Sequence, residues 1–224
     1  MSNRPNRSRR PGGAPSSEQD DRRRNLFLIA GVVVVVVIIG VLVALGGAED
    51  DGVSTDAPDF GPVAVDGTPL PELGDGGADP AVTQPAPQVE GTDPEGASLS
   101  IGGPGEPTMV AFLAHWCPHC QNEVPVIVDL MEEGELDGVR VVGVLTGTNP
   151  DAPNHPPVAW LEREGWEGDI LLDDERFTAG AAYGLSGYPF VVYLDGDGQV
   201  VSRTSGGVGR DGILLRVGEL QAAG

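Results

Sequence analysis

The sequence predicts an α/β fold in which a mixed sheet carries helices on both faces. Across residues 97–224, short apolar runs of strand length alternate with segments of helical periodicity, and the last two runs flank a tight turn. About 130 residues are sufficient for one hydrophobic core, so we expect a single folded domain there. Because an uncharged apolar run lies further upstream, we expect one transmembrane helix and a disordered linker to precede this domain.

The first half of the domain is predicted from apolar runs and one amphipathic stripe. Strands are expected at 99–101, 109–114 and 139–145, because these runs are apolar and of strand length. Apolar residues recur at helical spacing between the second and third runs, and Gly134 ends the pattern. The stripe comprises Val124, Ile127, Val128 and Met131. We therefore expect a helix that runs to about residue 133.

The second half continues the alternation of helices and strands. Helices are expected at about 158–164, 175–183 and 211–220, and strands at 170–172, 190–194 and 200–203. The residues between the last two strands are Asp195, Gly196, Asp197 and Gly198. They favour a hairpin turn over a calcium loop, because no bidentate glutamate follows at the required spacing. Trp160 and Trp166 are expected to pack the first of these helices against the sheet.

The two cysteines of the chain stand in the motif Trp116-Cys117-Pro118-His119-Cys120, between an apolar strand and a helix. This spacing and context are typical of a redox-active cysteine pair. A structural disulfide and half of a zinc site are the alternatives. Structural zinc usually takes four ligands, and the chain has no third cysteine.

The start of the predicted helix explains why these residue types suit redox chemistry. Cys117 falls at the N-cap and Pro118 at the first helical position, where its missing N–H costs nothing. The unpaired N–H groups and the helix dipole favour a thiolate over a thiol at Cys117. Cys120 lies one turn further along the same face, within reach of Cys117. We expect Cys117 to be the nucleophile and Cys120 to resolve the mixed disulfide.

The run from Val110 to Cys120 resembles the active-site strand and helix start of thioredoxin-like proteins, and its arrangement is most similar to their membrane-anchored TlpA/ResA-type branch. The resemblance covers about residues 85–220. It includes Gly187-Tyr188-Pro189-Phe190, which matches the loop that carries a cis-proline beside the redox pair. By this resemblance, Tyr188 and Pro189 shape a substrate groove, and the Tyr188 backbone pairs with an extended substrate. Trp116 would form part of the site wall.

Two departures from the family bear on the direction of electron flow. Cytoplasmic thioredoxins carry a buried aspartate where this chain has Ala111. The dipeptide Pro118-His119 is that of the DsbA oxidases, and a histidine in the first turn stabilises the Cys117 thiolate, which makes the disulfide more oxidising. The branch resemblance implies a reductase, for example of apocytochromes. We expect a comparatively oxidising couple, because the dipeptide acts directly on the sulfur.

The N-terminal part of the chain predicts a membrane anchor. Residues 1–25 hold seven Arg against three acids and are expected to form a cytoplasmic basic tail. Residues 26–45 are uncharged, and twenty residues suffice to cross a bilayer of about 30 Å as a helix. The positive-inside rule places the N-terminus in the cytoplasm and the catalytic domain outside. A cleaved signal peptide is the alternative, although its apolar region is usually shorter.

Residues 46–96 are rich in Gly, Pro and Asp and lack sustained periodicity, so we expect a flexible linker there. Residues 57–67 contain a hint of a short strand and turn. A docked hairpin is therefore the alternative to a mobile linker for these residues. After residue 25 the chain holds 31 acids against six Arg, and it contains no lysine. Such an acidic surface provides no cluster of basic residues that could bind nucleic acid.

These observations predict a membrane-anchored extracytoplasmic thiol-disulfide oxidoreductase that acts on protein thiols and disulfides. No cofactor or metal is expected, because the electrons reside in the cysteine pair. A membrane or extracytoplasmic redox partner must recycle the pair. The rivals are a static disulfide in a receptor module, a Sco-like copper chaperone, whose cysteines are spaced differently, and a peroxidase, whose threonine is replaced here by Ala114. For His115, the sequence is compatible with a position in the core, on the surface or at the rim of the site. His155 is expected in a solvated loop.

Overall fold

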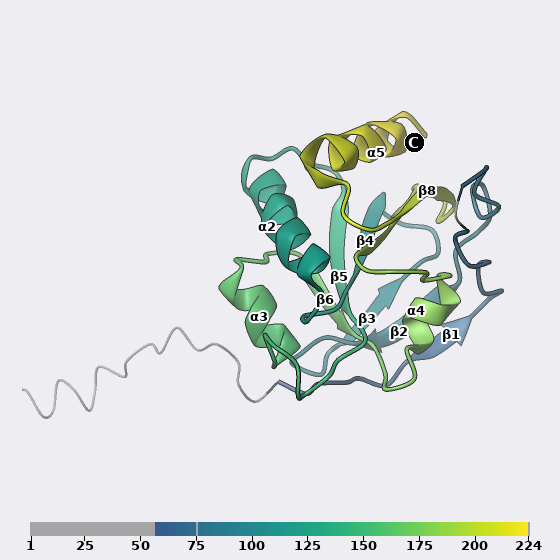
Figure 1. The fold of residues 1–224 in the computed structure, drawn as a ribbon. Coiled ribbons are helices and arrows are strands. Elements are labelled where there is room, and N and C mark those ends of the chain that lie inside the picture. Colours follow the sequence, from purple (N-terminus) through teal and green to yellow (C-terminus); the bar gives the residue numbers. More distant parts are fainter. Residues whose placement is uncertain (1–56, 75, 224) are drawn as a thin grey trace, which may run out of the picture. The chain divides into compact units, whose positions relative to one another are not determined.

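A computed structural model of the chain describes residues 57–74 and 76–223. Within this part, eight strands form one sheet and four helices pack against it (Figure 1). The strands are β1 (Ala64–Asp66), β2 (Gln88–Thr92), β3 (Ser98–Ile101), β4 (Thr108–Leu113), β5 (Arg140–Leu145), β6 (Asp169–Leu172), β7 (Phe190–Leu194) and β8 (Val200–Ser205). The helices are α2 (Pro118–Glu132), α3 (Pro157–Arg163), α4 (Thr178–Ala182) and α5 (Gly209–Ala223).

The sheet is mixed, as predicted. Its order is β1-β2-β6-β5-β4-β7-β8, with β3 paired to β2. Strand β4 is parallel to β5 and antiparallel to β7, while β7 and β8 form an antiparallel hairpin. The hairpin turn closes where the Gly198 N–H donates to the Asp195 carbonyl at 2.9 Å, which confirms the turn predicted there. Strand β4 therefore lies inside the sheet, between β5 and β7, and the cysteine motif follows its carboxyl end.

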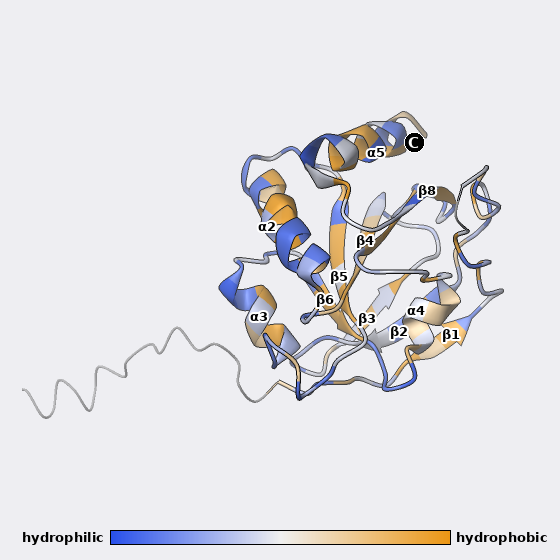
Figure 2. Ribbon diagram, in the orientation of Figure 1, coloured by the Kyte–Doolittle hydropathy of each residue, from blue (hydrophilic) through white to orange (hydrophobic). Residues whose placement is uncertain are grey.

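The two faces of β4 contribute to two hydrophobic clusters. Met109, Ala111 and Leu113 point to the face that α2, α3 and α5 cover, whereas Val110 and Phe112 point to the face that α4 covers. This alternation is the two-residue period of a strand buried on both sides. Helices thus cover both faces, as predicted, and Figure 2 shows hydrophobic colouring along the central strand β5.

The boundaries of the predicted elements differ from the observed ones by three residues or fewer. One of the larger differences is the start of α4, which was predicted at 175 and lies at Thr178. Phe177 explains the difference, because its φ of 59° lies in the left-handed region, which a right-handed helix excludes. Trp160 and Trp166 are buried in the cluster beneath α2 and α3, as expected.

The prediction of a flexible linker over residues 46–96 was wrong for its second part. The structure places 57–74 and 76–96 in the folded domain, where they form β1 and β2 and fill the cluster beside α4. The buried side chains of this N-terminal segment are Leu70, Ala81, Ala86 and Val89. The domain therefore begins well before residue 97. Residues 57–67 contain the single strand β1, which pairs with β2 and does not form a hairpin of its own.

Backbone hydrogen bonds hold the N-terminal segment, since it lacks long regular elements. The Leu70 N–H donates to the Ala182 carbonyl at 2.9 Å, and the Thr83 N–H donates to the Val200 carbonyl at 2.8 Å. The Val200 N–H in turn donates to the Gln84 carbonyl at 2.9 Å. These bonds attach the segment to α4 and to the start of β8.

A buried ion pair also fastens this segment to the sheet. The guanidinium of Arg203 on β8 has no exposed side-chain surface and donates to both carboxylate oxygens of Asp79, at 2.9 and 2.5 Å. It also donates to the carbonyls of Pro71 and Tyr183 at 2.9 Å each. The hydrogen bonds from Arg203 hold the pKa of Asp79 below its usual value despite burial.

The predicted basic tail, 1–25, and the predicted membrane helix, 26–45, lie outside the described residues. None of the helices between residues 57 and 223 is long and apolar enough to span a bilayer.

Candidate active site

Cys117 occupies the N-cap of α2, as predicted. Its backbone is extended, with φ −77° and ψ 121°, and Pro118 follows in the first turn. The Cys117 N–H donates to the Ala114 carbonyl at 2.9 Å, while the Cys117 carbonyl accepts the Gln121 N–H at 3.1 Å. The chain therefore turns directly from β4 into α2, and the first cysteine stands where the helix begins.

The two cysteines differ in burial. Both are free thiols, but Cys117 retains 6% of its surface while Cys120 retains none. Burial raises the pKa of the Cys120 thiol well above its usual value, and the neighbouring Cys117 and Glu123 add smaller contributions in the same direction. A thiol with a raised pKa stays protonated and unreactive until its surroundings change. The geometry thus distinguishes an outer cysteine from an inner one.

The loop before β7 lies against the outer cysteine. The Cys117 thiol donates to the Tyr188 carbonyl, with Sγ and O 3.7 Å apart, and the Tyr188-Pro189 peptide bond is cis. Pro189 is buried and Tyr188 is half-buried. The structure therefore brings both predicted groove residues beside the cysteine pair.

Trp116 forms a wall next to Cys117. Its side chain is 37% exposed, and its indole N–H donates to the Gly147 carbonyl at 2.7 Å. Its ring meets the Tyr188 ring edge to face, with centroids 5.7 Å apart. Pro118 and His119, in the first turn of α2, are both exposed on the surface beside this wall.

His115 is buried and serves as an anchor for the following loop. The Asn149 N–H can only donate, so the Nε2 atom of His115 accepts it at 3.1 Å, and Nδ1 donates to the Pro153 carbonyl at 2.7 Å. Burial lowers the pKa of His115, which favours this neutral form. Of the three positions left open by the sequence, the structure selects the buried one.

His155 has a specific partner in the N-terminal segment, which the sequence did not predict. Its Nε2 atom lies 2.9 Å from both carboxylate oxygens of Asp59, and its ring meets the His115 ring with centroids 5.9 Å apart. The expectation of a solvated loop residue is therefore corrected, because its side chain is only 25% exposed. A partner 96 residues away leaves no local signal in the sequence.

Glu123 is a buried acid that the sequence analysis also missed. It is 4% exposed, lies one turn after Cys120 on α2, and accepts the N–H groups of Val208 and Gly209 at 2.9 and 3.1 Å. Its carboxylate therefore caps the start of α5. The signal was available, because Glu123 falls on the helix face defined by Cys120 and Val124.

Asp173, at the end of β6, is a second buried acid. It is 1% exposed and accepts the N–H groups of Ala179 and Gly180 at 2.8 and 3.2 Å, so it caps α4. Burial raises its pKa, and the hydrogen bonds from the helix start partly oppose that effect. Within residues 57–74 and 76–223, no three or more His, Cys, Asp or Glu side chains are grouped so as to hold a metal ion.

Two solved structures share the fold of this domain. A thiol:disulfide interchange protein of the thioredoxin family from Chlorobium tepidum superposes with a TM-score of 0.50 at 22% identity, covering 64% of this chain and 99% of that one. The thioredoxin domain of a thiol-disulfide oxidoreductase from Bacteroides vulgatus also gives 0.50, at 21% identity, covering 62% and 96%.

The fold and the site define a thioredoxin-like α/β domain with a Cys-x-x-Cys pair at a helix start. The sequence model of the AhpC/TSA family matches residues 82–204, more than half of the chain. This chain belongs to the AhpC/TSA family.

The curated relatives that match this chain are named as thiol:disulfide interchange proteins or thiol-disulfide oxidoreductases. The chain is 32% identical to the thiol:disulfide interchange protein DsbE of Haemophilus influenzae, over 46% of this chain and 53% of that protein. It is 28% identical to the interchange protein HelX of Rhodobacter capsulatus, over 53% and 62%. It is 26% identical to the thiol-disulfide oxidoreductase ResA of Halalkalibacterium halodurans, over 52% and 64%. The matches thus span between about half and two thirds of these relatives.

Proposed function

We propose that this protein is a thiol-disulfide oxidoreductase that exchanges disulfides with protein substrates through Cys117 and Cys120. The observation that carries the proposal is the contrast within one helix turn. Cys117 stands at the helix start beside the Tyr188 carbonyl, and Cys120 is fully buried behind it. The named interchange function of the relatives supports the same conclusion.

The exchange proceeds in two balanced steps. In the reducing direction, the Cys117 thiolate attacks one sulfur of a substrate disulfide, and the other substrate sulfur leaves and takes up a proton. Cys120 then loses its proton and attacks the Cys117 sulfur, which releases the first substrate sulfur as a second thiol. Two electrons pass to the substrate, and the pair becomes a disulfide. Oxidation of a substrate is the reverse sequence.

The substrate would bind as an extended segment along the loop before β7. The Tyr188 carbonyl lies at the outer cysteine and is available to pair with a substrate backbone N–H. Trp116 closes one side of this position. Ala114, three residues before Cys117, carries no hydroxyl for a peroxide, so the site favours disulfide exchange over peroxide reduction.

The direction of exchange is tested by the reduction potential. His119 in the first turn of α2 would stabilise the Cys117 thiolate, and we propose a comparatively oxidising couple on that basis. Equilibration with glutathione should give a potential above that of cytoplasmic thioredoxin, about −270 mV. Replacement His119→Pro should lower it. A wild-type value near about −270 mV would favour a reductase, for which apocytochromes are one candidate substrate.

The proposed location is outside the cytoplasm, with residues 26–45 as a single-pass anchor. The uncharged run and the Arg residues before it support this orientation. A redox partner in the membrane or outside it would recycle the cysteine pair. A reporter enzyme that is active only outside the cytoplasm, fused after Gly224, should be active. Activity of a cytoplasm-specific reporter at the same position would contradict this orientation.

A further inference from the structure

Phe177 has an unfavourable backbone conformation and an unfavourable environment. Its φ of 59° and ψ of 36° lie in the left-handed region, which costs a residue with a β-carbon about 1–2 kcal/mol. Its ring is 44% exposed, so little burial compensates. Its backbone N–H donates to the Asp174 carbonyl and its carbonyl accepts the Ala181 N–H, which glycine would do without strain. Such strain at an exposed side chain indicates a role outside the stability of the fold.

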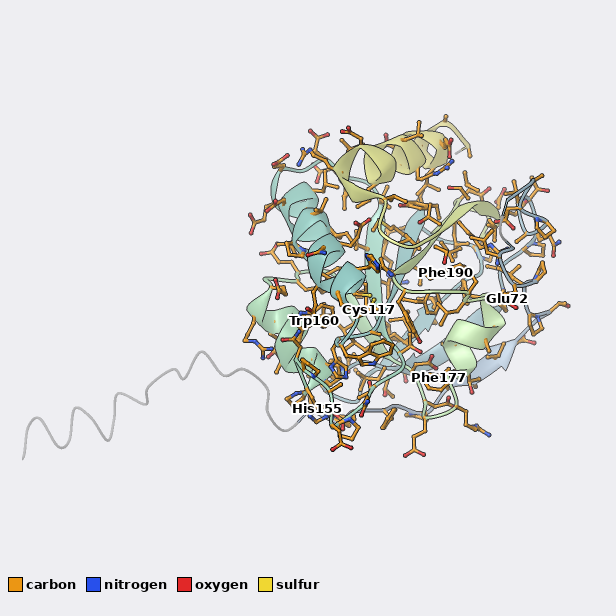
Figure 3. The ribbon with its side chains drawn as sticks, viewed as in Figure 1. Glu72, Cys117, His155, Trp160, Phe177 and Phe190 are labelled. Atoms are coloured by element: carbon orange, nitrogen blue, oxygen red, sulfur yellow. The ribbon has the colours of Figure 1, made fainter. Side chains whose placement is uncertain are left out.

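The Phe177 ring lies at the same glycine as the aromatic wall of the active site. A β-carbon added to Gly147 would lie 3.6 Å from the Phe177 ring and 2.8 Å from the Tyr188 hydroxyl. The Trp116 indole N–H donates to the carbonyl of this glycine. Three rings, those of Trp116, Tyr188 and Phe177, therefore surround Gly147, and we call them the aromatic shelf. Figure 3 labels Phe177 and Cys117.

The aromatic shelf runs from the wall beside the reactive cysteine to the exposed ring of Phe177. Trp116 and Phe177 are the two exposed aromatic side chains among residues 57–74 and 76–223, and both belong to it. No member of the shelf is charged. Exposed aromatic residues of this kind commonly anchor a bound polypeptide, because they supply contact area at a low entropic cost.

We propose that Phe177 is a specificity-determining residue that contacts an apolar side chain next to the reactive cysteine of an extended substrate segment. The occupant is a protein segment with a leucine-like residue in that flanking position. Phe177 and Tyr188 meet at Gly147, and the Tyr188 carbonyl contacts Cys117, so the contact falls beside the substrate sulfur in the proposed arrangement. This inference rests on the proposed exchange function and assigns its substrate preference.

Matched peptides test the proposal. Each carries one cysteine linked by a disulfide to 2-nitro-5-thiobenzoate, and leucine, serine or arginine flanks that cysteine. Attack of reduced Cys117 on the peptide sulfur releases the coloured thiolate, which gives the rate. The wild type should prefer the leucine peptide to the serine peptide. Phe177→Gly should reduce this preference about five- to tenfold, the equivalent of one aromatic contact.

Three controls separate recognition from folding. Phe177→Gly should unfold at the wild-type temperature or above, because glycine suits the left-handed backbone. Phe177→Tyr keeps a ring and should restore the preference for leucine. Leu215→Ala, at an exposed residue of α5, should leave the preference unchanged.

The outcomes distinguish this inference from the function on which it rests. A preference for leucine that is equal in wild type and Phe177→Gly would overturn the inference, as would a wild-type preference for the arginine peptide. Failure of the reduced wild type to react with any peptide or with glutathione disulfide would instead contradict the proposed exchange function.

Discussion

Cys117 and Cys120 are chemically identical, and their positions make them different. Cys117 is the N-cap of α2 and has an extended backbone, whereas Cys120 lies one helical turn further on and has no exposed surface. Because burial raises the pKa of Cys120, the inner thiol remains protonated, and in the proposed exchange the outer one reacts first. The order of the two steps follows from this difference.

This order predicts opposite results for the two serine variants. Cys120→Ser should accumulate mixed disulfides with client proteins, because the outer sulfur can bond to a client and nothing releases it. Cys117→Ser should accumulate none. Non-reducing electrophoresis of both variants measures the trapped species, with the double serine variant as the control. Equal trapping by both single variants would contradict the assignment of Cys117 as the nucleophile.

Asp79 and Arg203 set a second prediction at the level of single residues. Removal of one partner leaves a buried charge without compensation, so Asp79→Ala should lower the free energy of unfolding by about 3 kcal/mol. Glu219→Ala, which breaks an exposed pair with Arg216, is the matched control and should cost less than about 1 kcal/mol. Chemical denaturation at neutral pH measures both changes.

The same pair predicts a pH dependence whose sign is fixed. The pKa of Asp79 is lower in the folded chain than in the unfolded chain, so its contribution is complete above about pH 4 and is lost as the pH falls through the folded value. The stability difference between wild type and Asp79→Ala should therefore shrink in acid. A difference that stays constant from neutral pH to strong acid would contradict this account.

The helix α5 depends on a side chain from another helix. Its first N–H groups are satisfied by the Glu123 carboxylate of α2, so its start is fixed by a residue about 85 positions earlier. The sequence predicts that α5 exists, from its apolar positions, but not what caps it. Local periodicity identifies elements, whereas contacts between elements need the fold.

Glu123 therefore has two separable effects. Glu123→Ala should lower the free energy of unfolding by about 1–3 kcal/mol, because it leaves buried N–H groups without an acceptor. Glu123→Gln keeps an acceptor and should retain most of that stability, while loss of the negative charge should lower the pKa of Cys120. Denaturation midpoints and alkylation of Cys120 against pH, in a Cys117→Ser background, measure the two effects. Equal destabilisation by both variants would show that a neutral acceptor cannot replace the carboxylate, and would contradict the separation of the two effects.

At the scale of the whole molecule, the sequence predicts the fold from residue 97 onward but not the segment before it. The later strands and helices are contiguous periodic runs, and the cysteine motif and the Tyr188-Pro189 loop are local patterns. In the N-terminal segment, Leu70, Ala81 and Val89 are buried one at a time between polar, Gly and Pro residues. Isolated apolar residues give no periodicity, and the pairing of Asp59 with His155 gives no local signal either.

The burial of this segment predicts how truncation acts. A chain that begins at residue 97 lacks β1, β2 and Asp79, so it should lose its cooperative unfolding transition. A chain that begins at residue 57 keeps them and is the matched control. Thermal unfolding followed by circular dichroism compares the two. A cooperative transition of equal midpoint in both chains would show that the segment is dispensable.

The attachment of residues 83–86 to the start of β8 also bears on how this protein behaves beside other copies of itself. Strand β8 is the last strand of the sheet, and an outermost strand is a template on which a second polypeptide can add. Here the chain's own backbone occupies the first part of that template, through the bonds between Val200, Thr83 and Gln84. The proposed clients are extended, unpaired segments, and the start of this edge is closed to them because the chain's own backbone already occupies it.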